Sequence, residues 1–159
     1  MSTINIITTI NAPIERCVDL ATSIDLHKTS ARNSQEEAIA GITSGFIKLN
    51  ETVTWRAKHF GIWHKMKVKI TEYEKPNYFI DEMVQGTFKF MKHNHAFRTE
   101  NNYTLMTDTF EFASPLGPIG RLVDLLILKR YMTSFLKERN GVIKDFAESE
   151  KWRAVLLES

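Results

Sequence analysis

A long helix-like segment near the end of the chain constrains the fold more than any other feature. The sequence Ser114-Pro115-Leu116-Gly117-Pro118 interrupts a series of alternating segments, and residues 119–146 then follow the period of an amphipathic helix. Its apolar stripe contains Leu122, Leu125, Leu126, Met132, Phe135, Leu136, Ile143 and Phe146. Such a helix is roughly 40 Å long, so a small domain must cover its stripe with a second layer. A curved antiparallel sheet is the expected partner, and this arrangement tends to leave a cavity between helix and sheet.

Short alternating segments predict the strands of this sheet. In residues 63–72, Met66, Val68 and Ile70 alternate with lysines, which gives one apolar and one solvated face. Further strands are expected at residues 3–10, 42–49, 51–60, 78–84, 88–98 and 103–112. A short helix is expected at residues 14–21 and a second within residues 23–40. The order predicts an α+β fold: a seven-stranded curved antiparallel sheet, two short helices, and the long C-terminal helix across the concave face.

The first hairpin of the sheet has a turn sequence that suggests its register. Gly61-Ile62 has glycine at the first position, as two-residue hairpin turns often do. With this turn, Phe60 pairs with Trp63, and Trp55 lies opposite Val68 on the apolar face.

Composition indicates one ordinary globular domain. The chain has 159 residues, of which 43% are hydrophobic and 25% charged, and its formal net charge of +2 is too small to indicate nucleic-acid binding. We expect one domain over residues 1–148 and a tail over residues 149–159. The apolar residues of the tail either extend the helix or dock on a partner, such as a second copy of the chain in a homodimer. The most apolar stretch, residues 122–128, is too short for stable membrane insertion.

A single cysteine, Cys17, bears on the cellular compartment. It cannot form an intrachain disulfide, and no secretory signal opens the sequence, so we expect a cytoplasmic protein. Cys17 follows the apolar period of the first helix, which favours a buried residue over a nucleophile. No glycine-rich phosphate loop follows a strand, and we expect no cofactor.

The predicted strand at residues 88–98 carries the residues of greatest chemical interest on one face. Alternation places His93 and His95 together on this face. If Arg98 pairs with Tyr103, His93 lies opposite Asp108 on the next strand. A three-residue loop on the other side places Asp81 on the same face, opposite His93 or one pair along. We therefore predict that His93 lies on the concave face between two carboxylates.

Such a cluster permits three interpretations. His93 with Asp108 or Asp81 could serve as a catalytic acid and base, because imidazole titrates near neutral pH and a buried carboxylate fixes its tautomer. Alternatively, the polar side chains only satisfy one another in a wet cavity. A metal could also bind His93 and His95, but no cysteine cluster and no assured third histidine accompany them, so we predict no metal site.

Apolar and aromatic side chains expected on the concave face and on the helix could form a pocket for a flat or greasy ligand, or could simply pack the core. The predicted ligand-contacting residues are Trp55, His59, Met66, Val68, Met91, His95, Phe97, Phe110, Leu122, Leu126 and Phe135.

Several short motifs resemble those of the SRPBCC superfamily, the helix-grip proteins that include START lipid-binding domains, birch-pollen-allergen-like proteins and polyketide cyclases. The similarity covers essentially the whole chain and is strongest to small bacterial SRPBCC proteins. The motifs are Asn11-Ala12-Pro13, Thr52-Val53-Thr54-Trp55, His59-Phe60-Gly61-Ile62-Trp63, Phe79-Ile80-Asp81-Glu82-Met83, His93-Asn94-His95-Ala96-Phe97, Met106-Thr107-Asp108, Ser114-Pro115-Leu116-Gly117 and Leu128-Lys129-Arg130-Tyr131-Met132.

This resemblance implies a cavity whose mouth is guarded by the hairpin loops and by the loop before the long helix. It leaves three functions open, because the superfamily carries several on one scaffold. The first is binding of a small hydrophobic or amphipathic ligand. The second is a cyclase or aromatase activity, and the third is a surface interaction module related to stress or cell division.

Overall fold

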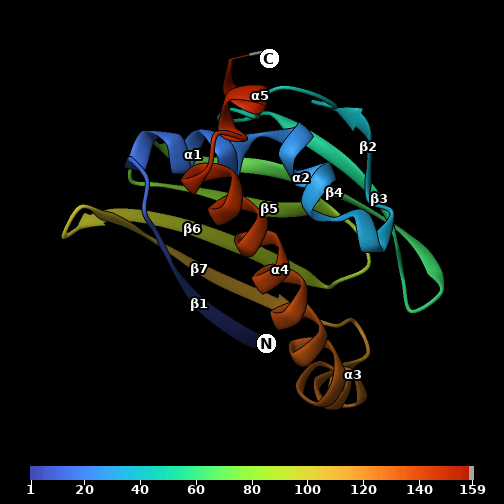
Figure 1. The fold of residues 1–159 in the computed structure, drawn as a ribbon. Coiled ribbons are helices and arrows are strands. Elements are labelled where there is room, and N and C mark those ends of the chain that lie inside the picture. The colour runs from blue at the N-terminus through green and yellow to red at the C-terminus, as the bar shows by residue number, and fades with distance from the viewer. Residues whose placement is uncertain (158–159) are drawn as a thin grey trace.

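The computed structural model describes residues 1–157 and shows a curved sheet that holds a long helix on its concave side (Figure 1). The strands are β1 (Ser2–Ile10), β2 (Glu37–Gly41), β3 (Thr52–His59), β4 (Ile62–Glu74), β5 (Tyr78–Gln85), β6 (Phe90–Glu100) and β7 (Tyr103–Ala113). The helices are α1 (Ile14–Thr22), α2 (Ile24–Ser30), η1 (Arg32–Ser34), α3 (Gly117–Val123), η2 (Asp124–Leu128), α4 (Lys129–Glu148) and α5 (Trp152–Leu156). None of the described helices has the length and hydropathy needed to cross a membrane.

All seven strands form one antiparallel sheet in the order β1-β7-β6-β5-β4-β3-β2, and α4 crosses its concave face (Figure 1). Register shifts in β4, next to Val68 and Ile70, mark bulges that bend the sheet. The buried side chains of β7 alternate with less buried ones, as one-sided packing against α4 requires. The predicted fold class is therefore confirmed.

Residues 42–49 do not form the expected strand. The second strand is β2 instead, and the chain then runs irregularly to β3 with one isolated bridge between Ser23 and Phe46. β2 ends at Gly41, whose φ of 74° is unfavourable for other residues, and a Cβ there would lie 2.2 Å from the Thr52 carbonyl oxygen. Gly41 thus ends a strand where we expected one to begin.

Both predicted hairpin registers are wrong by two residues. The turn between β3 and β4 is Phe60-Gly61, with φ angles of 53° and 75°, so Trp55 pairs with Met66 rather than Val68. Both turn residues have positive φ, the geometry of the two-residue turns that match strand twist. A shift of two residues changes each partner but keeps every side chain on its face.

A similar two-residue turn, Asn101-Asn102, joins β6 to β7, with φ angles of 50° and 67°. His93 therefore pairs with Phe110, and His95 pairs with Asp108, where we expected His93 opposite Asp108. On the other side, Asp81 pairs with His93, one of the two positions predicted. The cluster still assembles because all these side chains stay on the concave face.

The long helix begins differently from the prediction. Residues 124–128 form a wider π-helical turn, and Asp124, only 1% exposed, takes the inward position by accepting a hydrogen bond of 2.9 Å from the Ser114 backbone N–H. An extra residue in the turn rotates the helix before it relative to α4. Leu122 and Leu126, expected on the buried stripe, are consequently 57% and 63% exposed.

Residues 149–157 neither extend α4 nor point away from the domain. Ser149 has an extended backbone, with φ −112° and ψ −177°, and this conformation ends the helix. Helix α5 then contacts α1, where the Arg16 guanidinium lies 4.3 Å from the centre of the Trp152 ring. Trp152, Val155 and Leu156 are partly buried against the core. Residues 158 and 159 of the predicted tail lie outside the described residues.

Candidate functional site

A cavity of about 400 Å³ lies between α4 and the concave face of the sheet. Its walls come from β3 to β7, the end of α1, α2 and the segment from residue 114 to α4. All five histidines of the chain line it, namely His27, His59, His64, His93 and His95. All the imidazole side chains of the chain are therefore gathered around one mostly apolar space.

Most of the predicted site residues reach this cavity. Those that line it are Trp55, His59, Met66, Val68, Asp81, Met91, His93, His95, Phe110 and Phe135. Phe97 is buried in the core beside Phe79, and Asp108 lies fully buried behind the histidines. Leu122 and Leu126 are at the surface, so the structure gives them no contact with the cavity.

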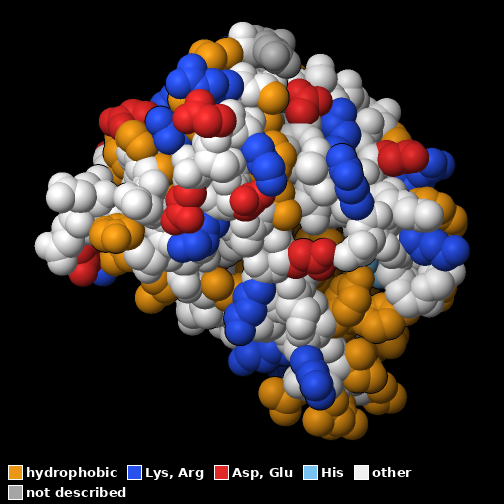
Figure 2. Space-filling view, in the orientation of Figure 1, with side chains coloured by type: hydrophobic (Ala, Val, Ile, Leu, Met, Phe, Trp, Pro, Cys, Tyr) orange, Lys and Arg blue, Asp and Glu red, His pale blue; other side chains and the backbone are white. Residues whose placement is uncertain are grey.

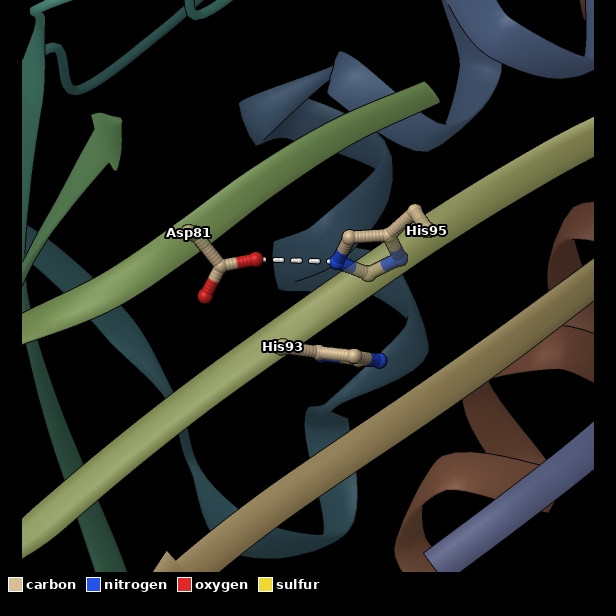
Figure 3. A group of neighbouring side chains, drawn as sticks. All are labelled: Asp81, His93 and His95. Carbon is tan, nitrogen blue, oxygen red and sulfur yellow. Dashed lines mark hydrogen bonds and ion pairs between the residues drawn. The ribbon is translucent and has the colours of Figure 1, made fainter. Parts of the chain in front are cut away.

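At the sheet side of the cavity, Asp81, His93 and His95 lie next to one another (Figure 3). His95 Nε2 donates to Asp81 Oδ2 at 2.9 Å, and His93 Nε2 donates to Asp108 Oδ1, also at 2.9 Å. His95 Nδ1 lies 2.9 Å from Asp108 Oδ1, although this contact is not aligned as a hydrogen bond. Each carboxylate thus bonds to the histidine diagonal to it rather than to its direct cross-strand partner.

The helix completes the cluster through Asn140, which our sequence reasoning missed. Its Nδ2 donates to Asp108 Oδ2 at 2.6 Å and lies 3.2 Å from Thr8 Oγ1. Asn140 and Arg139 are both buried, at 1% and 6% exposure. They occupy the inward positions between Leu136 and Ile143, so polar residues within the apolar helical period were the signal that could have revealed them.

The pKa values of the two central histidines, His93 and His95, are shifted in opposite directions. Burial, and secondarily the neighbouring His95, lower the pKa of His93 to about 4, so His93 is neutral at neutral pH. Burial also acts to lower the pKa of His95, but its contacts with Asp108 and Asp81 outweigh burial and raise that pKa above its usual value. His95 is therefore the more easily protonated member of the pair.

Both carboxylates stay ionised. Burial by itself would raise the pKa of Asp108, but hydrogen bonding to His93 and contact with His95 hold it well below its usual range. For Asp81, burial likewise acts upward and is outweighed by the hydrogen bond from His95, so its pKa is also lowered. A neutral His93 that donates from Nε2 has an unprotonated Nδ1, the arrangement expected of a general base.

Three further histidines mark the rest of the cavity wall. His27 contacts Glu36 at 2.8 Å and stacks on Trp55 with ring centres 4.2 Å apart. His59 Nδ1 lies 2.6 Å from the Tyr131 hydroxyl oxygen, and burial lowers the pKa of His59. The third, His64, lies 3.2 Å through its Nδ1 from Thr87 Oγ1. The stacking of His27 on Trp55 links α2 to the sheet, and the contact of His59 with Tyr131 links the sheet to α4.

A metal ion fits the cluster poorly. One candidate donor atom from each of Asp81, His93 and His95 lies within 4.8 Å of the others. Zinc ligands lie about 2.0–2.2 Å from the ion. Coordination through the Nε2 atom of either histidine would break a hydrogen bond to a carboxylate that the structure already holds. The geometry favours a hydrogen-bonded cluster.

Cys17 is not part of this site. Its side chain is fully buried, and burial raises the pKa of its thiol to about 11. At neutral pH it is a small apolar residue of the core rather than a nucleophile.

Comparison with solved structures supports the fold. TTHA0849 from Thermus thermophilus superposes with a TM-score of 0.70 and 19% identity, covering 89% of this chain and 97% of that one. The major latex-like protein 151 of Panax ginseng gives a TM-score of 0.68 and 16% identity, covering 92% and 97%. Ara h 8.0201 gives 0.62 and 12%, covering 89% and 97%.

No family model matches the chain, and no curated protein sequence matches it. At these identities the structural likeness concerns the fold alone, over nearly the full length of each chain. The chain therefore has the helix-grip fold, as its resemblance to the SRPBCC superfamily predicted.

Proposed function

We propose that this protein binds a small hydrophobic or amphipathic molecule in the cavity between α4 and the sheet. The observation that carries the proposal is the cavity of about 400 Å³, which is lined mostly by apolar side chains with a smaller number of polar ones. Its volume lies in the usual range for small-molecule sites, about 300–1,000 Å³. The predicted resemblance to ligand-binding helix-grip proteins points to the same function.

The energetic cost of an unfilled cavity supports the proposal that a ligand occupies it. Protein interiors are close-packed, and voids larger than a water molecule are few and costly. Here Trp55, Met66 and Phe135 line unfilled space although each is large enough to close part of it. Since Cys17 is the single cysteine and is buried unpaired, the proposal places this binding in a reducing compartment such as the cytoplasm.

Filling the cavity from the sheet should abolish binding. Ala57 is buried and lines the cavity from β3, so Ala57→Phe would place a ring in the ligand space. We expect wild type to bind the apolar fluorophore N-phenyl-1-naphthylamine, and A57F to bind it at least about tenfold more weakly. Ala96→Phe on the outer face of β6 is the matched control and should bind like wild type. Equal fluorophore binding by A57F, with its fold intact by circular dichroism, would contradict the proposal.

One observation favours a second candidate, an enzyme of the cyclase or aromatase type. A neutral His93 hydrogen-bonded to Asp108 in an apolar cavity has the arrangement of a general base. The two functions differ in the fate of the ligand. A poly-β-ketone incubated with the protein and extracted again keeps its mass and ring pattern under the binding proposal, whereas cyclisation faster than in buffer would establish the enzyme.

A further inference from the structure

Arg139 is a buried cation without an ionic partner among the described residues. It extends from α4, lines the cavity and is 6% exposed. Its Nη2 donates one hydrogen bond of 3.3 Å to the Ala21 carbonyl oxygen, and its buried Nε donates none. None of the ion pairs within residues 1–157 includes it. A buried charge in this state is costly unless something pairs with it.

The neighbouring carboxylates are already engaged. Asp108 accepts hydrogen bonds from His93 and Asn140, and Asp81 accepts one from His95. Arg139 is near enough for its charge to act on Asp81 and His95, yet no carboxylate oxygen of the described residues comes within 4 Å of the guanidinium. The cavity thus presents one unpaired guanidinium beside an apolar space.

We infer that the cavity takes a ligand with an apolar body and a single carboxylate, and that this carboxylate pairs with Arg139. The inference rests on the proposed function and names its ligand class. A guanidinium matches a carboxylate in a planar, two-bond geometry, and its positive charge balances one negative charge. A doubly charged phosphate would require a further cation, whereas His95 is already held between two carboxylates.

Matched amphiphiles test the inference. In calorimetric titrations at pH 7, we expect wild type to bind decanoate about ten- to a hundredfold more tightly than 1-decanol, the gain of charge-assisted bonds in a buried site. Arg139→Gln should remove this preference and leave decanol affinity unchanged, whereas Arg139→Lys should keep part of it. Arg56→Gln is the control, because Arg56 pairs with Glu37 outside the cavity.

The outcomes of this experiment distinguish failure of the Arg139–carboxylate pairing from failure of the proposed ligand binding. Decanol binding without a decanoate preference in wild type, or an equal preference in R139Q, would overturn the role of Arg139 and leave the proposed function standing. If neither compound binds wild type, the proposed function fails as well. Urea unfolding of each variant shows whether an altered affinity comes from an altered fold.

An independent observation concerns the surface that covers one side of the cavity. We define the α3 patch as six apolar side chains, each at least 51% exposed. They are Leu116, Ile119, Leu122, Leu125, Leu126 and Ile127. Figure 2 shows hydrophobic side chains gathered at the bottom of the view, where α3 lies in Figure 1. Exposed apolar surface of this extent marks an interaction site.

The charges around the α3 patch indicate what it contacts. Arg121, Lys129 and Arg130 form no ion pair with any described residue. Asp124, the single acidic residue in 114–130, is buried against Ser114. Docking of this surface on a second copy would bring like charges together. Anionic lipid headgroups above an apolar layer match both the basic and the apolar side chains.

We propose that the α3 patch docks reversibly on an anionic phospholipid surface. Wild type should sediment with vesicles containing phosphatidylglycerol and much less with phosphatidylcholine alone. The double variant L125E/L126E should lose at least about tenfold in vesicle affinity, because charged side chains replace those that enter the interface. Ile7→Glu, at an exposed apolar position on β1, is the matched control.

Other results would overturn this assignment. Equal sedimentation of L125E/L126E and wild type would remove the patch from any membrane contact. A dimer in light scattering that dissociates in L125E/L126E, with no vesicle binding by wild type, would show a second copy as the occupant instead.

Discussion

Replacing Asp108 by alanine is expected to lower the free energy of unfolding by about 4 kcal/mol, within the range for removing one partner of a buried ion pair. Asp108 is completely buried and accepts hydrogen bonds from His93 and Asn140. Its loss leaves His95 with one carboxylate instead of two, and leaves Asn140 Nδ2 without its shortest bond. Urea unfolding monitored by tryptophan fluorescence at pH 7 measures the change.

Two further variants test whether the loss of stability in D108A comes from the buried cluster. Asn140→Ala removes the bond from α4 alone and should cost about 2 kcal/mol, as expected for a hydrogen bond to a charged group. Thr109→Ala, on the solvent side of the same strand, should cost less than about 1 kcal/mol. A loss in D108A no larger than that in T109A would show that the cluster does not stabilise the fold.

The faces of the central strands could be predicted from sequence, whereas their partners could not. Alternation in β6 and β7 is strict because one side of the sheet is buried, and it placed His93, His95 and Asp108 on the concave face correctly. The partners depend on turns, and Asn101-Asn102 adopts a two-residue geometry that moves every pair by two positions. The predicted residues still meet in the cluster, because diagonal neighbours on a sheet remain within reach of long side chains.

For the long C-terminal helix, the sequence did not predict which side chains point inward. A continuous apolar period predicted one inward stripe, but Asp124 took the inward position by bonding to Ser114, and the leucines beside it turned outward. The same focus on apolar residues missed Arg139 and Asn140, which follow the inward period while being polar. Cavity volume was also beyond prediction, because it depends on how side chains from distant segments pack.

The pH dependence of stability should show a maximum near pH 6.5. The pKa of His93 is about 4 in the fold and about 6.5 in an unfolded chain. Between these values the unfolded chain binds a proton that the folded protein does not, so acidification from pH 6.5 to 4 should cost about 3 kcal/mol. The half-buried His59, whose pKa is also lowered, adds a loss of the same sign.

Above the pH of maximum stability, the free energy of unfolding should fall as the pH rises. The pKa of His95 is raised in the fold, so its contribution is complete below pH 6.5 and is lost as pH rises through the folded value. The lowered pKa values of Asp81 and Asp108 stabilise the fold above about pH 4, and this contribution disappears at lower pH. The histidines therefore set the slopes around neutrality, and the carboxylates set the final acid transition.

His93→Gln separates these contributions, because its amide nitrogen can still donate to Asp108 but carries no titrating proton. Urea unfolding between pH 4 and 8 should show that H93Q loses most of the decline between pH 6.5 and 4, while His59→Gln loses a smaller part. An unchanged acid slope in H93Q would mean that His93 accepts a proton in the folded protein as readily as in the unfolded chain. That result would show that His93 titrates near its ordinary pKa, whereas a lost slope would establish that this imidazole stays neutral in the fold down to about pH 4.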